Sequence, residues 1–218
     1  MKYKITLLMA FVSWTFTANA QSNQMKDFVK VDEVTIQRYD DNWYLISVPF
    51  ELPVHPNEDE KPKSLGEVLN HDFIEDLTIR LTICFQNQFL KKKMGSKLKL
   101  STKDLLVYFQ SEVNYHILEI NRDEKKTHFL FPKMVAEQGD FISGSPKMSG
   151  YVVEIFYKNQ NVELEDNILF ENYSDKEILQ NFQEEALSKA SENDHILIPG
   201  HIIEPKLMHD AGVILFKE

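Results

Sequence analysis

The sequence is short of cysteine: Cys84 is the only one among its 218 residues. A single cysteine forms no disulfide within the chain, so the fold depends on the burial of apolar side chains. The sequence also lacks a glycine-rich phosphate loop, a GxSxG nucleophile elbow and an HExxH zinc motif. It therefore predicts no catalytic residue and no cofactor.

Positive charge is in deficit, because 24 Lys and Arg face 34 Asp and Glu, which gives a net charge of −10. Proteins that bind nucleic acid neutralise phosphates with Lys and Arg, and this composition argues against such a partner. It argues equally against binding to anionic lipid. The acidity mainly favours solubility.

Long apolar runs are missing after the first twenty residues, and residues 1–20 have the pattern of a secretory signal peptide. A positively charged start precedes the mostly apolar Ile5–Phe16, and Ala-Asn-Ala at 18–20 is a typical cleavage site. The apolar run is shorter than the ~20 residues of a membrane-spanning helix, so cleavage is preferred to an uncleaved anchor. The sequence predicts an exported protein, in the periplasm or on the outer cell surface, with no integral membrane segment after cleavage.

Alternation of apolar and polar residues predicts that most of the remaining chain is β-strand. The clearest strand is Leu77–Phe85, whose odd-numbered residues form an apolar face, while Cys84 falls on the polar face. Residues 28–39 and Trp43–Leu52 are expected to pair as an antiparallel hairpin, with Pro49 at an edge or a bulge. The other predicted strands are two within 105–120, then 127–131, 151–157, 162–164, 195–198 and 211–216.

Charged or proline-rich segments between these strands are predicted to be loops. Pro53–Asp72 is expected to be a long surface loop and Lys91–Gly95 a basic, exposed turn. Asn121–Lys126 is expected to be a charged hairpin turn, and Met134–Met148 an irregular segment.

One helix is predicted, beginning at Ser174, because Ser174 and Glu177 have the spacing of a capping box. Apolar residues then recur at helical spacing from Ile178 to Ala190, and the helix is expected to end within 191–194. It should dock its apolar stripe on the sheet. Residues 161–218 are therefore expected to form this helix and two short strands, packed on the same domain as the preceding strands.

Histidines and acidic residues gather late in the sequence, at His195, His201, Glu204, His209 and Asp210. Imidazoles and carboxylates are zinc ligands, but this spacing matches no metal motif in which a helix aims the ligands. Surface histidines are therefore the preferred interpretation, and a metal site at His195, His201 and His209 is the alternative.

Cys84 is a second candidate for chemistry, since His71 or His116 could approach it and activate the thiol. The interior of a regular strand is a poor platform for a nucleophile, because reactive cysteines favour helix N-termini and electropositive pockets. A structural cysteine is the preferred interpretation. Whether it is buried or available to a partner stays open.

Four segments, DDNWYLISVPFEL, FIEDLTIRLTICF, THFLFPKMVAEQGDF and YVVEIFYKN, carry a family resemblance. They resemble exported verrucomicrobial proteins that are encoded near pilus-assembly components and have an immunoglobulin-like β-sandwich. The resemblance spans Val34–Tyr157 and carries over no residue-level role. The expected fold is mainly β: an immunoglobulin-like antiparallel sandwich over residues 21–160, with long loops and the late helix packed on the sheet.

The resemblance implies a non-enzymatic structural or interaction module of a cell-surface or pilus-type assembly, with other exported or pilus-type proteins as partners. A first alternative is an exported protein that binds a glycan or small ligand, through exposed aromatic residues of the strands. A metal-assisted hydrolase built on the late histidines is a further alternative.

Overall fold

The computed structural model describes residues 28–56, 72–94, 105–142, 147–164, 167–171, 173–207 and 215–216. The predicted signal peptide and most of the predicted loop at Pro53–Asp72 lie outside these residues. Among the described helices, none is long and apolar enough to span a membrane.

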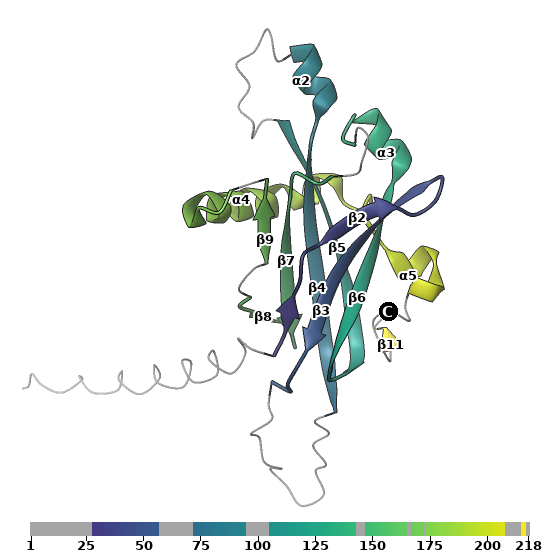
Figure 1. Ribbon diagram of the computed structural model, residues 1–218, viewed down its shortest axis with the longest axis vertical. Helices are drawn as coiled ribbons and strands as arrows, with labels where there is room; N and C mark the ends of the chain where they lie inside the picture. Colours follow the sequence, from purple (N-terminus) through teal and green to yellow (C-terminus); the bar gives the residue numbers. More distant parts are fainter. Residues whose placement is uncertain are drawn as a thin grey trace, which may run out of the picture.

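The described chain is mainly β, with two antiparallel sheets and a few helices (Figure 1). The first sheet has the order β1-β3-β6-β10, and β2 pairs with β3 beside β1. Its strands are β1 (Lys30–Val31), β2 (Thr35–Arg38), β3 (Trp43–Leu52), β6 (Asn121–Pro132) and β10 (Ile198–Pro199).

The second sheet has the order β11-β5-β4-β7-β8, and β9 also pairs with β7. Its strands are β4 (Phe73–Gln86), β5 (Leu106–Glu119), β7 (Gly150–Tyr157), β8 (Gln160–Val162), β9 (Ile168–Phe170) and β11 (Leu215–Phe216). The helices are α2 (Gln88–Met94), α3 (Lys133–Gln138), α4 (Lys176–Lys189), the short 3-10 helix η2 (Ala190–Asn193) and α5 (Gly200–Ile203).

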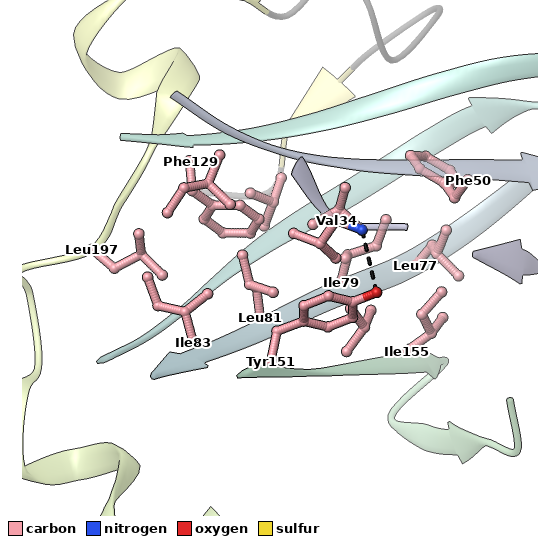
Figure 2. Packing of buried hydrophobic residues seen from close by; sticks show 14 of the residues in the cluster. Val34, Phe50, Leu77, Ile79, Leu81, Ile83, Phe129, Tyr151, Ile155 and Leu197 are labelled. Carbon is pink, nitrogen blue, oxygen red and sulfur yellow. Dashed lines mark hydrogen bonds between the residues drawn. The ribbon is translucent and has the colours of Figure 1, made fainter. Parts of the chain in front are cut away.

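Apolar side chains from both sheets form one shared core (Figure 2). The predicted apolar face of β4, Leu77 to Phe85, is fully buried there, which confirms its register. Tyr151 of β7 reaches across this core, and its hydroxyl accepts a hydrogen bond from the Val34 backbone N–H at 3.4 Å. Because Val34 precedes β2, this hydrogen bond joins the two sheets through their common interior.

The predicted hairpin of the first sheet is confirmed, with Thr35 of β2 opposite Ser47 of β3. Pro49 lies in an interior strand, because β3 has β1 and β2 on one side and β6 on the other. Of the two predicted positions for this proline, the edge is therefore wrong. Pro49 itself is in register opposite Lys126, and the ladder shifts register only between Phe50 and Leu52, where the additional residues are on β6.

The prediction for residues 105–131 is partly wrong. Residues 106–119 form one strand, not two, and the expected charged turn Asn121–Lys126 is the first half of β6. The Lys125 side chain is buried opposite Phe50, and its ammonium group donates to the Asn121 side-chain oxygen. Its burial lowers its pKa, although Glu119 and Asp123 oppose the shift. The long alkyl stem of a lysine can be buried, although the sequence shows only a charged residue that is expected in solvent.

Two helices replace segments predicted as a turn and as irregular chain. Lys91–Gly95 was expected to be a turn, yet 91–94 complete α2, whose start is stabilised by a hydrogen bond from the Leu90 N–H to the Asn87 side chain. Within Met134–Met148, residues 134–138 belong to α3, which follows Pro132. Both helices are short, and six or seven residues carry little periodic signal.

The predicted late helix is confirmed as α4, with a different N-cap. The Asp175 carboxylate, not the Ser174 hydroxyl, accepts hydrogen bonds from the backbone N–H groups of Glu177 and Ile178. Phe182 and Ala186 are buried against the outer face of the second sheet, as expected.

The segment Ala190–Leu207, which we call the strap, contacts both sheets. It begins with η2 beside β5, continues through β10 at the edge of the first sheet, and ends where Leu207 packs on Leu45 and Leu130. The chain therefore passes from α4 on one side of the sheets to α5 on the other (Figure 1). The predicted strand 195–198 is mostly wrong, because residues 195–197 lie in a turn and β10 begins at Ile198. β11 lies within the predicted strand 211–216, whose first four residues are outside the described ranges.

The two faces of β4 give a stability prediction. We expect Leu81→Ala to lower the unfolding free energy by about 2–5 kcal/mol, because a fully buried side chain leaves a cavity. Thr82 is also buried, where its hydroxyl accepts from the Gln110 amide at 2.9 Å, so Thr82→Ala should cost about 1 kcal/mol. Urea denaturation of both variants measures the difference, and equal losses would contradict it.

Candidate functional site

A hollow of about 490 Å³ lies at the edge of β5, between this strand and the strap. Its volume is within the range of small-molecule sites, roughly 300–1,000 Å³. It is lined by Gln110, Ser111, Glu112, Asp194, His195, Leu197, Ile198, Pro199 and Ile202.

The hollow lies where the strap runs beside β5: η2 contacts this strand, and β10 lies close to it as well. The Asn193 side-chain amide donates to the Tyr108 carbonyl oxygen at 2.9 Å. The chain then turns at His195, which adopts a left-handed conformation with φ 66°. Leu197 inserts into the shared core, and Ile198 pairs with Leu130 in the other sheet. The strap therefore leaves a gap beside the middle of β5.

No strand of the described chain pairs with the outer edge of β5 along this gap. Since the Tyr108 carbonyl points outward to Asn193, strand alternation directs the backbone groups of Gln110 and Glu112 to the same side. Within the described residues, the next pairing on this edge is with β11, at Tyr115 and Ile117. The hollow thus combines apolar side chains with backbone donors and acceptors of an open strand edge.

The charge at the hollow is predominantly negative. Glu112 accepts hydrogen bonds from Arg80 at 2.9 and 3.0 Å, and Arg80 also lies 3.7 Å from Glu154 and over the Phe156 ring. Burial raises the pKa of Glu154, and the Arg80 guanidinium opposes this rise. Asp194 adds a further, exposed carboxylate at the rim.

The late histidines lie on different parts of the strap or outside the described residues. His195 lines the hollow, whereas His201 lies on α5, where burial lowers its pKa. Glu204 follows α5 and pairs with Lys206, and His209 and Asp210 lie outside the described residues. Across the described ranges, no group of three or more His, Cys, Asp and Glu side chains could hold a metal ion.

Cys84 lies on the outward face of β4, as its parity predicted, but it is completely buried beneath α4. Burial raises the pKa of the thiol, and the nearby charges of Glu171 and Glu185 add to this effect. His116 lies at the far end of the strand pair, where it faces Asp76 at 3.5 Å, while Cys84 is opposite Tyr108. His71, the other histidine considered, lies outside the described residues. The thiol is buried, which answers the question that the sequence left open.

A hydroxyl–imidazole pair that sequence reasoning missed joins β3 and β6. Ser47 Oγ lies 2.9 Å from His128 Nδ1, and both residues are only 6% exposed. The chain at Gly200 covers this pair so closely that a Cβ there would lie 3.0 Å from the His128 carbonyl oxygen. A nucleophile must reach its substrate, so this pair has a structural role. Only the register of the two strands brings the residues together.

The aromatic residues give little support to a sugar-binding platform. Tyr108, Tyr115, Phe129 and Tyr151 are buried in the cores. Among the described residues, the strongly exposed aromatic side chains are Phe89 and Tyr173, which lie on α2 and just before α4 and form no row along a sheet.

Comparison with protein-family models, with curated proteins and with solved structures found no match to this chain. Its functional interpretation therefore rests on its own geometry.

The burial of Cys84 predicts that its thiol is inert in the folded protein. We expect a maleimide to label it only upon unfolding, because burial hides the sulfur and disfavours the thiolate. Phe182→Ala, which removes a ring of the same cluster, should accelerate labelling under native conditions. Native labelling as fast as in denaturant would contradict the packing of α4 on β4.

The raised pKa of Glu154 predicts a dependence of stability on pH. The folded state binds this proton more tightly than the unfolded state, so stability falls as the pH rises above the usual glutamate value, about 4.3. Glu154→Gln resembles the protonated form. We therefore expect its unfolding free energy, relative to the parent, to increase from pH 4 towards neutrality.

Denaturation at several pH values measures this effect. Glu184→Gln, at an exposed position of α4, is the control for a carboxylate in solvent. If the difference in unfolding free energy between Glu154→Gln and the parent stayed constant with pH, this would contradict the desolvation of Glu154.

Proposed function

We propose that this chain is a non-enzymatic, exported interaction module of a cell-surface or pilus-type assembly, and that it has an immunoglobulin-like fold. The observation that carries the proposal is the hollow at an edge of β5 with which no described strand pairs, where apolar side chains and backbone groups lie together. Such an edge is a common recognition element for partner proteins.

The strand order supports the immunoglobulin-like part of the proposal. The neighbours β2-β3-β6 follow the order A-B-E of such sandwiches, and β5-β4-β7-β8 follow C′-C-F-G. The strap, β10 and β11 are additions at the side of the sandwich where the hollow lies.

The burial of the reactive side chains supports a non-enzymatic role. Cys84, Ser47 and His128 are all inaccessible, and of these described nucleophiles and bases none lines the hollow. Ser111 and His195 do line it, and His195 is exposed beside Asp194.

Binding of a small ligand is the second candidate function, and the volume of the hollow favours it. It competes with the interaction module for the same surface. The two functions differ in the molecule that is bound: a ligand-binding protein holds a small molecule in the hollow, whereas an interaction module holds another exported protein there.

The proposal predicts that substitution of Ile202 disrupts the assembly. Ile202 lines the hollow and is 62% exposed, whereas its neighbour Ile203 is 47% exposed and is not a lining residue. In the native host, chemical cross-linking of the tagged full-length protein should recover exported, pilus-type proteins. We expect Ile202→Asp to lose them and Ile203→Asp to keep them, because a carboxylate opposes burial in an interface.

Equal recovery with both variants would show that the hollow is not the interaction surface. The intact mass of the exported protein provides a further check, since the proposed export requires that Met1–Ala20 be removed.

A further inference from the structure

We infer that the hollow receives an extended segment of the partner protein, which adds as a β-strand to the outer edge of β5. This inference rests on the proposed function and specifies the chemistry of the partner: alternating β-branched residues, with a basic residue near each end.

The backbone of β5 sets the position of the added strand. The outward N–H and C=O groups of Gln110 and Glu112 face the hollow, between the Asn193 contact at Tyr108 and the β11 pairing at Tyr115. β11 already pairs antiparallel with this same edge, so the edge accepts a strand. An incoming strand along Gln110–Asn114 would satisfy these groups and would be only a few residues long.

The strap supplies the side-chain pocket. Leu197, Ile198, Pro199 and Ile202 form an apolar wall of the hollow opposite Gln110–Glu112. Side chains of an added strand alternate between two directions, so every second one would face this wall. β-branched residues suit both the strand and the wall, since they favour extended backbone and bury apolar surface.

The rim selects the charge of the partner. The carboxylates of Glu112 and Asp194 lie at the hollow, and Arg80 is shared between Glu112 and Glu154, so the local balance is acidic. The whole chain also carries a net charge of −10. Lys or Arg beside the apolar residues of the partner strand would complement this rim, and acidic residues would be repelled.

A synthetic peptide tests strand addition directly. The probe is a blocked peptide of alternating valine and threonine with a lysine at each end. We expect it to bind the full-length protein and to slow amide hydrogen exchange at Gln110 and Glu112. Two matched peptides separate the causes: one has N-methylated valines, which cannot donate backbone hydrogen bonds, and one has glutamates in place of the lysines.

The N-methylated valines and the glutamates should each weaken peptide binding by roughly tenfold or more. In the protein, Ile202→Asp should weaken binding to the same degree, whereas Ile203→Asp should bind the peptide like the parent. Equal binding of the N-methylated peptide, or unchanged exchange at Gln110 and Glu112, would overturn strand addition. Equal binding of the glutamate peptide would overturn the charge preference.

The two proposals can fail separately. If Ile202→Asp loses its cross-linked partners in cells but the peptide leaves exchange at Gln110 and Glu112 unchanged, the interaction module stands and strand addition is wrong. If the variant keeps its partners, the interaction surface itself is misplaced, whatever the peptide does.

Discussion

The burial of β4, on both of its faces from Leu81 to Phe85, is the constraint on which the structure depends. One face, from Leu77 to Phe85, fills the core that the two sheets share, and Cys84 on the other face packs beneath α4. With a single cysteine, the chain has no internal disulfide to stabilise it, so close packing of these two layers must supply the stability. The hydrogen bond from Val34 to Tyr151 adds a polar link between the sheets inside that core.

The strap follows from this arrangement. A two-sheet sandwich leaves strand edges open at its sides, and the strap covers part of one side by contacting β5 through Asn193 and β6 through Ile198. Because it crosses from one sheet to the other, it cannot follow β5 along its whole length. The uncovered part of that edge is the hollow, so the same segment both protects the sandwich and creates its candidate binding surface.

Several potentially reactive side chains of this chain are buried, away from the hollow. The side chains that attract attention as possible catalysts, Cys84 and the Ser47–His128 pair, are inside, where they satisfy packing and hydrogen bonding. The surface of the hollow has apolar side chains, carboxylates and backbone groups, together with Ser111 and His195. Apolar side chains, charge and an open strand edge are features by which proteins recognise extended segments of other chains.

The sequence by itself determined the elements whose signal is local. The alternation along β4 and β7 and the apolar stripe of α4 are periodic patterns within a single segment, so they could be predicted. The hairpin of β2 and β3 could be predicted because its two strands are adjacent in the sequence. The first half of β6 was missed because Lys125 is a core residue only when Phe50 lies opposite it. The burial of Cys84, the Ser47–His128 contact and the hollow each require residues that are far apart in the chain. Tertiary packing alone decided these, because periodicity reports which face a side chain is on and not what covers that face.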